Sequence, residues 1–536
     1  MTDFHKKSIQ SLLSEKRLAE AFAELRQTAQ TLQNWQLNNR LDELEESYKY
    51  MIRYVADGCN DPQREEIHNG ITAKLMELAD ITEQELTVQN SPKLYYETLR
   101  MERKYPRSLE ALLEAYRECA DKTALFYELP ADKRDSDQER TLLMEKEKAA
   151  NAVFKHIWVT FPVTADEAGT LDKLFADADA TAEIKELAMA ATMLSLLEHY
   201  SEHLLLSLLD LYAANAFNDA SLSMKALCCA LIAMHCHRET IKHSSAISLR
   251  IANIADSERG RRDIMTVFLQ FIRSRSTERI SQKVRDELVP KLMKLSPEMR
   301  RKMRDGFSDD IEEMAKNPDW QEMLNESGIT DKMQELSRMQ AEGSDVFLSS
   351  FARLKSFPFF NDVANWFVPF TPRHSSIFRV FAGNSGSMLL SMVDRTGAFC
   401  DSDKFSFALS VATMPEQHRS MMMAQFDEQQ EQVINEMASS LPNPDKQREN
   451  IANKYVQSLY RFFNLFRSRN DFYNPFSTRL NLIDVPFVSD ALSDTKSLRL
   501  IAEFYFSMQC YTDALSTFGK VLKQDSPTAS DYQKTG

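Results

Sequence analysis

Glycine is scarce in this chain, and its scarcity narrows the range of possible folds. Only 12 of the 536 residues are glycine. Nucleotide-binding loops and β-hairpin turns need glycine at positive φ, whereas helices joined by short turns need very little of it. Apolar residues recur at spacings of three and four along most of the chain, which is the period of an amphipathic helix. The sequence therefore predicts an all-α fold.

The motifs of the common nucleotide-binding and hydrolytic enzymes are missing from the sequence. The two closest glycines, Gly383 and Gly386, form neither GxGxxG nor GxxxxGK[ST], and no GxSxG is present. No Ser/His/Asp or Cys/His set stands in a recognisable context. We therefore expect no cofactor, and we expect the chain not to be an enzyme.

Composition predicts a cytoplasmic protein. Residues 1–30 carry charges throughout and lack the apolar stretch of a signal peptide, and no apolar run approaches the length of a membrane span. The seven cysteines form no CxxC pair, which favours reduced thiols in a cytosol. A net charge of −14 argues against general nucleic-acid affinity. We expect no membrane partner.

A period of about 39 residues is visible in residues 181–300. Apolar or small quartets recur at that shift: Leu187, Ala190, Ala191 and Leu194; Ala226, Cys229, Ala230 and Ala233; Met265, Phe268, Leu269 and Ile272. A second helix is expected after each first one, with Leu209, Leu249 and Leu288 in similar places. Two helices in a unit of about 40 residues resemble HEAT repeats, and this resemblance implies stacked helix pairs.

Residues 491–536 carry a second repeat pattern. The positions expected to form its core are Leu498, Ile501, Ala502, Tyr505, Ala514, Phe518, Val521 and Pro527. Large residues around a small one on a first helix, small and large residues on a second, and a following proline resemble a tetratricopeptide repeat (TPR). Ala502 lets the second helix approach closely, and Phe518 fills the space beside the neighbouring unit.

A further TPR unit is expected to begin at the end of the sequence. Tyr532 stands 34 residues after Leu498, and Gly536 completes the Tyr-x-x-x-Gly pattern that opens such a repeat. We expect the chain to be the N-terminal part of a longer protein that resembles large bacterial TPR proteins. That resemblance implies protein binding in a concave groove, with the exposed positions Arg499 and Glu503 as contacts. Some members of that family hold a terminal carboxylate with lysines and asparagines, and Glu503 stands near the place where such a groove would need an asparagine, so no clamp is expected.

The sequence divides into five regions. The fourth of them, residues 301–490, contains an aromatic-rich stretch over 347–370. We expect this stretch to be a domain junction with buried rings rather than an exposed docking patch. The first region resembles a TPR unit weakly through Ile9, Leu12, Ala21 and Leu25. The regions are an N-terminal helical domain (1–125), a charged linker and helix (126–180), HEAT-like repeats (181–300), a helical region (301–490) and the TPR unit with the start of a second (491–536). Together they predict an α-solenoid of HEAT-like and TPR-like helix pairs with irregular helical inserts.

Two histidine groups are candidates for metal binding. His199 and His203 form H-x-x-E-H with Glu202, and on one helical face they would share a zinc ion with the glutamate as base. The flanking leucines indicate a repeat core instead, and we interpret the motif as a chance match. The second group contains His235, His237 and His243 with Cys228 and Cys229. These residues either form a thiolate–imidazole metal site or belong to a helix core in which the cysteines are buried.

One segment has the opposite charge to the rest of the chain. Residues 259–304 hold 14 Lys and Arg against five Asp and Glu. Such a segment binds nucleic acid or an anionic partner, or it keeps outward helix faces soluble. The leading hypothesis is a protein-interaction scaffold. The alternatives are a sensor or regulatory region of an enzyme or effector beyond residue 536, and anionic-partner binding through this basic segment.

Overall fold

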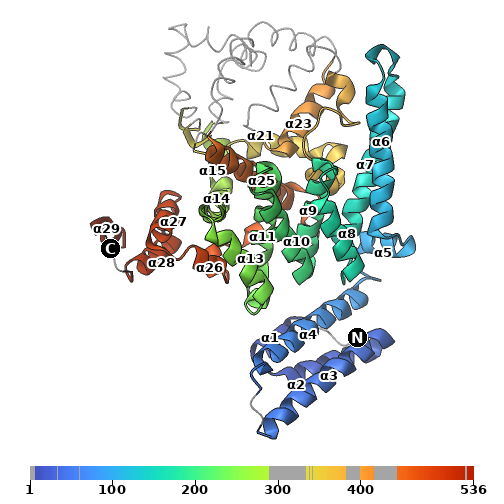
Figure 1. Ribbon diagram of the computed structural model, residues 1–536. Coiled ribbons are helices and arrows are strands. Elements are labelled where there is room, and N and C mark those ends of the chain that lie inside the picture. The colour runs from blue at the N-terminus through green and yellow to red at the C-terminus, as the bar shows by residue number, and fades with distance from the viewer. Residues whose placement is uncertain are drawn as a thin grey trace.

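The structure, a computed structural model, describes residues 6–32, 34–58, 61–288, 334–336, 338–340, 342–381, 399–415, 443–524 and 528–535. Every regular element in these residues is a helix, and no strand is present among them (Figure 1). The prediction of an all-α fold is confirmed. Within the same residues, no helix combines the length and apolar character that crossing a bilayer requires.

Four N-terminal helices form a unit with an apolar core of its own (blue in Figure 1). They are α1 (Lys6–Ser14), α2 (Leu18–Leu32), α3 (Trp35–Ala56) and α4 (Arg64–Thr87). Leu25, Leu41 and Leu75 are fully buried between them. Helix α3 begins where the side chain of Asn34 accepts a hydrogen bond from the backbone N–H of Leu37.

The next helices alternate between two layers. After α5 (Leu94–Lys104), one layer contains α6 (Leu109–Glu128), α8 (Ala165–Ala176), α10 (Glu202–Asn215) and α13 (Ser245–Asp256). The other contains α7 (Ser136–Val159), α9 (Ala182–Glu198), α11 (Ala220–Cys236) and α14 (Glu258–Ser274). Neighbours pack in this order within each layer, and five successive pairs pack across the layers: α6–α7, α8–α9, α9–α10, α10–α11 and α13–α14. Seven of the eight begin at a Ser, Thr or Asp whose side chain caps the first turn.

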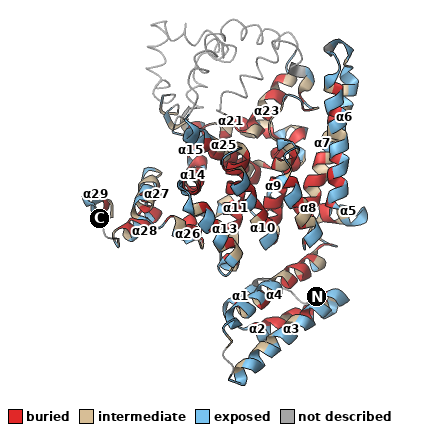
Figure 2. Ribbon diagram, viewed as in Figure 1, coloured by how far each residue is buried: buried red, intermediate tan, exposed pale blue. Residues whose placement is uncertain are grey.

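Helix α11 lies in the middle of the main apolar core. All of its residues from Leu222 to His235 are buried, so it presents no polar face to solvent (Figure 2). Small side chains such as Ala226, Cys229 and Ala230 allow neighbours to approach it from every side. Those neighbours are α9, α10, α14 and α25 (Pro444–Leu465).

The 39-residue pattern is largely buried, with one clear exception. Eleven of the twelve quartet residues are buried, and Leu269 is half-buried. Leu209 is also buried, but Leu249 is 56% exposed on α13. The expected equivalence of these two leucines is therefore wrong, because α13 turns that position toward solvent. The side chain of Leu288 lies outside the described residues.

Helix α25 enters the main core from far along the sequence. It packs against α11 and α14, on the side of the second layer, and it is flanked by irregular helical segments (Figure 1). The helices and turns that precede α25 in the chain, besides those named above, are the 3-10 turn Ala131–Lys133, α12 (Arg238–Ile241), α15 (Thr277–Lys283), the π-helix Val284–Leu288, α21 (Leu348–Ala352), the 3-10 turns Arg353–Ser356, Pro358–Asn361, Ala364–Trp366 and Phe378–Phe381, and α23 (Asp401–Ala412). Those that follow α25 are the 3-10 turns Arg469–Asp471, Pro475–Ser477 and Leu482–Asp484, and α26 (Val488–Ala491).

The aromatic stretch at 347–370 packs mainly inward. Phe360, Trp366 and Phe367 are buried, and Trp366 and Phe367 contact Phe462 of α25 with ring centroids 5.8 and 4.9 Å apart. The predicted burial of these rings is confirmed. The prolines keep the segment in short 3-10 turns, so consecutive aromatic residues reach several neighbouring helices.

Three helices complete the described C-terminal part. They are α27 (Thr495–Ser507), α28 (Tyr511–Val521) and α29 (Ala529–Thr535). Helices α27 and α28 form an antiparallel hairpin that packs on α14 through α27, and α29 packs on α28. The buried apolar residues of this hairpin belong to the main core.

Candidate functional site

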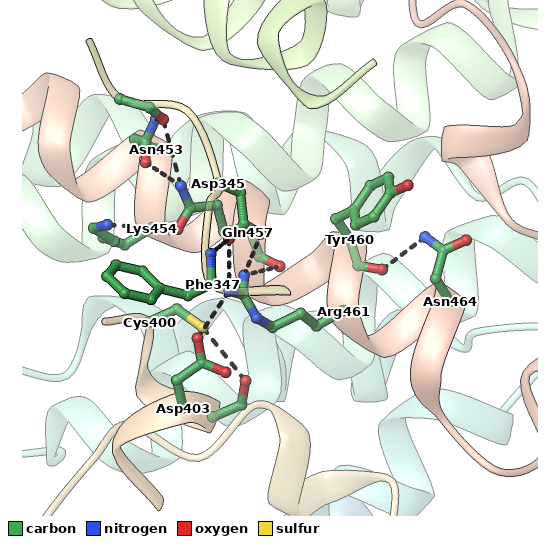
Figure 3. Close-up of polar contacts among 12 residues, drawn as sticks. Asp345, Phe347, Cys400, Asp403, Asn453, Lys454, Gln457, Tyr460, Arg461 and Asn464 are labelled. Atoms are coloured by element: carbon green, nitrogen blue, oxygen red, sulfur yellow. Dashed lines mark hydrogen bonds and ion pairs between the residues drawn. The ribbon is translucent and has the colours of Figure 1, made fainter. Parts of the chain in front are cut away.

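Helix α25 carries Arg461 into the interior, where it meets two carboxylates from distant segments (Figure 3). Only 1% of the Arg461 side chain is exposed. Its Nη2 donates a hydrogen bond of 2.9 Å to Asp345 Oδ1, and its Nη1 lies 2.8 Å from Asp345 Oδ2. Nη2 also lies 2.9 Å from Asp403 Oδ2, as an ion pair without hydrogen-bond alignment. Burial lowers the pKa of Arg461, but the two carboxylates outweigh it and raise that pKa.

Local structure positions both carboxylates. Asp345 follows a turn at Gly343, whose φ of 89° favours glycine and whose carbonyl accepts a 2.7 Å hydrogen bond from Asn453 Nδ2 of α25. Asp403 lies in the first turn of α23, where the helix N-terminus favours a negative side chain. The turn and the helix end therefore bring two charges from different parts of the sequence to one arginine.

Lys355 completes the charge balance of this cluster. Its Nζ lies 3.0 Å from Asp403 Oδ1 and donates a 3.0 Å hydrogen bond to Ser406 Oγ. The ammonium also lies 4.6 Å from the ring centroid of Phe360. Burial lowers the pKa of Lys355, and Asp403 opposes that change. Arg461 and Lys355 are thus buried with Asp345 and Asp403, and no solvent reaches these four charges. Such a buried cluster holds packed segments in place rather than binding a diffusing substrate.

A second buried pair ties the other end of α25 to the two layers. Arg448 Nε and Nη2 donate to Asp263 Oδ1 and Oδ2 of α14 at 2.9 and 2.6 Å. The same carboxylate accepts a 2.8 Å hydrogen bond from the hydroxyl of Tyr212. Arg448 also donates to Ser223 Oγ and to the carbonyl oxygen of Ala216, both at 3.2 Å. Bidentate geometry and additional acceptors offset the cost of burying the charges.

The two histidines of the H-x-x-E-H motif do not share a helical face. His199 ends α9 and is buried, with its ring stacked on Phe161 at 4.3 Å, whereas His203 lies on α10 and is exposed. Ser201 caps α10 and separates the two helices. The geometry required for shared zinc binding is therefore contradicted, because the helix is broken inside the motif. Among the described residues, no group of three His, Cys, Asp or Glu side chains is arranged to bind a metal.

The second histidine group is also spread through the structure. Cys228 and Cys229 are buried in α11, and burial raises the pKa of both thiols. His235 is buried with Nε2 3.2 Å from Thr478 Oγ1. His237 bonds to the carbonyl of Leu196, and His243 is exposed. These groups do not converge on one point.

The predicted core of the TPR unit is buried, but its predicted contact residues are engaged within the chain. The buried residues are Leu498, Ile501, Ala502, Tyr505, Ala514, Phe518 and Val521. Pro527 lies outside the described residues. Arg499 is paired with the buried Asp531 of α29 at 2.9 Å, and Glu503 is paired with Lys534. Neither side chain is therefore fully available to a partner.

Most basic side chains of the 259–304 segment that the structure describes are paired within the chain. Residues 289–304 lie outside the described part. Five of the eight described Lys and Arg residues have a carboxylate partner: Arg262, Arg273, Arg275, Lys283 and Arg285. Several of these carboxylates come from distant segments, such as Asp445, Glu449 and Asp513. Four of the eight described basic side chains, those of Arg262, Arg273, Arg275 and Lys283, therefore connect this segment to distant parts of the chain.

Comparison with known proteins identifies no relative. No family model, no curated protein and no solved structure matches the chain.

The buried arginines were not predicted from the sequence, although one signal for them was present. Ala452, Tyr455, Leu459 and Phe462 mark the buried face of α25, and Arg448 stands seven residues before Tyr455 on that same face. A charged residue on an apolar helix face predicts a buried partner. Its partner Asp263 carries no comparable signal, because it stands among the many charges that open α14.

His156 of α7 lies between glutamates of two other helices. Its Nδ1 lies 3.4 Å from Glu102 Oε2 of α5, and its Nε2 lies 3.0 Å from Glu167 Oε1 of α8. Burial opposes the positive charge, but hydrogen bonds to the two glutamates raise the pKa of His156 to about 9. The folded pKa exceeds the unfolded value, so the stabilisation is complete below pH of about 6.5 and is lost as pH rises through about 9.

The variant His156→Gln is expected to remove about 3 kcal/mol of this pH-dependent stability at about pH 6 and much less above about pH 9. Urea unfolding at several pH values measures the difference. His203→Gln, at an exposed histidine, is the control and should leave the pH profile unchanged. An equal loss of stability by His156→Gln at both ends of the pH range would contradict the raised pKa of His156.

Proposed function

We propose that the chain is a protein-interaction scaffold built as an α-solenoid. The observation that carries the proposal is the order of packing in the main body, where the long helices from α6 to α14 alternate between two layers and each contacts the next helix of its own layer. Such stacking creates an extended surface, and proteins built in this way commonly bind other proteins. The TPR-like hairpin α27–α28 continues the second layer through α14.

The binding face is proposed on the hairpin rather than on the second layer. Helix α25 already covers α11 and α14, so a partner cannot occupy that position without displacing it. On the hairpin, Tyr511 and Leu515 are exposed at a spacing of four on α28. Phe506 is also exposed, with its ring centroid 5.6 Å from that of Tyr511. We call these three residues the hairpin patch.

The partner expected at the hairpin patch is a protein segment with apolar anchors and flanking acidic residues. Exposed aromatic residues supply large contact areas and are frequent at the energetic centres of interfaces. Lys523 is exposed just after α28, and Lys534, which lies 5.6 Å from the ring centroid of Phe506, is shared with Glu503. These ammonium groups favour carboxylates at the edge of a bound segment.

The variant Leu515→Glu is expected to reduce partner capture about tenfold or more, because a carboxylate would be buried at the centre of the interface. Leu249→Glu is the matched control, since Leu249 and Leu515 are 56% and 53% exposed. The measurement is quantitative mass spectrometry of proteins retained from native lysate by each immobilised variant. Equal retention by both variants, or no protein enriched by the unaltered chain, would reject the proposal.

A further inference from the structure

Helix α3 carries a row of exposed side chains on the face that points away from the core of the N-terminal unit. Its residues Leu37 and Leu41 are buried, and its neighbours are α2 and α4. Most other residues of α3 are exposed (Figure 2). Spacings of three and four place seven exposed residues on the outward face. We call them the outer stripe: Trp35, Asn39, Glu43, Glu46, Tyr50, Tyr54 and Asp57.

Three aromatic side chains of the outer stripe are in contact with solvent over most of their surface. Trp35, Tyr50 and Tyr54 are 68%, 62% and 61% exposed. Tyr50 and Tyr54 stand four residues apart, so their rings occupy neighbouring positions on one helix face. Leaving this much apolar surface in water is costly, and large rings repeated along one face are typical of a surface that binds a partner.

Three carboxylates of the outer stripe lie beside these rings. Glu43, Glu46 and Asp57 are exposed, and none of them makes an ion pair with the residues that the structure describes. Their surroundings are acidic as well, because residues 34–87 hold 12 Asp and Glu against five Lys and Arg. The resulting net charge of −7 is half of the −14 carried by the whole chain. The outer stripe therefore attracts cations.

The basic residues of α3 do not cancel this negative charge. Arg40 and Lys49 are paired with Glu77 and Glu45, whereas Arg53 borders the outer stripe. The excess of carboxylates repels nucleic acid and anionic membranes. A second copy of the chain would bring the same carboxylates to the stripe, and the juxtaposition of like charges disfavours such pairing. The occupant that the charges favour is cationic.

We propose that the outer stripe binds a partner protein through a segment rich in arginine and lysine. Guanidinium and ammonium groups pair with carboxylates and also lie over aromatic rings, so one such segment uses both kinds of side chain on the stripe. From Glu43 to Tyr54 the helix rises roughly 16 Å, which an extended segment spans with about five residues. The outer stripe lies on the N-terminal unit, apart from the hairpin patch, and its binding does not depend on that patch.

Fluorescence anisotropy of a labelled octa-arginine peptide, titrated with the full chain at an ionic strength of about 0.15 M, tests the proposal. Saturable binding is expected. Tyr50→Ala combined with Tyr54→Ala should weaken it about tenfold, because two cation–π contacts are lost while the net charge stays the same. Tyr105→Ala combined with Tyr532→Ala is the matched control, since these tyrosines are 59% and 57% exposed outside the stripe. It should leave the affinity unchanged.

A second pair of variants tests the carboxylates. Glu43→Gln combined with Glu46→Gln should weaken peptide binding about tenfold, whereas Glu118→Gln combined with Glu128→Gln makes the same change of net charge at exposed positions of α6 and should have little effect. Absence of saturable binding, or equal weakening by the stripe variants and their controls, would overturn the proposal. Self-association of the unaltered chain in sedimentation, abolished by Tyr50→Ala with Tyr54→Ala, would assign the stripe to a second copy and would overturn it as well.

Discussion

Replacing Arg461 by methionine is expected to lower the free energy of unfolding by about 3–5 kcal/mol. The methionine fills most of the volume but leaves Asp345 and Asp403 with one positive partner fewer in a region closed to water. Lys355 is paired with Asp403, so it does not replace the positive charge that Asp345 loses with Arg461. The loss should appear as a lower urea midpoint for the main body.

Urea unfolding followed by the fluorescence of Trp158 and Trp366 measures this effect, because both indoles are buried in the main core. Arg467→Met is the matched control, at an exposed arginine just after α25, and its effect should stay within about 0.5 kcal/mol. A loss of less than about 1 kcal/mol for Arg461→Met would show that the buried ion pairs contribute little.

Truncating Phe462 to alanine is the second large effect expected, with a loss of about 3–5 kcal/mol. Phe462 is fully buried on α25 and its ring contacts those of Trp366, Phe367 and Phe466. Because several rings from separate segments surround it, the space left behind cannot close by movement of one side chain. The same urea titration gives the magnitude.

Phe217→Ala serves as the control for that prediction. Phe217 is 75% exposed, and its ring contacts mainly the guanidinium of Arg259 at 4.8 Å. Its removal should cost no more than about 1 kcal/mol, the value of an exposed cation–π contact. Similar losses for Phe217→Ala and Phe462→Ala would contradict the placement of Phe462 at the centre of the aromatic cluster.

Local patterns predicted the helices well because apolar spacing directly reports which face of a helix is buried. The quartets at Leu187, Ala226 and Met265 lie on α9, α11 and α14, where the predicted residues are mostly buried. Each of these features depends on residues close together in sequence, so periodicity was sufficient.

The position of α25 could not be obtained from the same patterns. Its apolar face indicates that it is buried, but the period of a helix does not identify the surface that covers it. Arg448 meets Asp263 across 185 positions, and Arg461 meets Asp345 across 116. Such pairs are set by tertiary packing, and either partner alone looks like an ordinary surface charge.

The candidate sites show the same limit. The H-x-x-E-H motif assumed one continuous helix, whereas the Ser201 cap begins a new helix inside it. Arg499 and Glu503 were expected to be exposed from their places on one helix, but α29 supplies Asp531 and Lys534 to pair with them. In both cases a neighbouring element changed what the local pattern implied.

Hydrogen exchange of the intact chain, measured by mass spectrometry, tests most directly whether α25 is an integral part of the main body. Amides of α25 between Ala452 and Phe463 should exchange as slowly as those of α11 between Ala226 and Met234, because both are buried and open together. Peptides from α3, where Trp35, Tyr50 and Tyr54 are exposed, provide the fast-exchanging reference. Rapid exchange of α25 while α11 stays protected would instead show a detachable helix and would leave the second layer open to a partner.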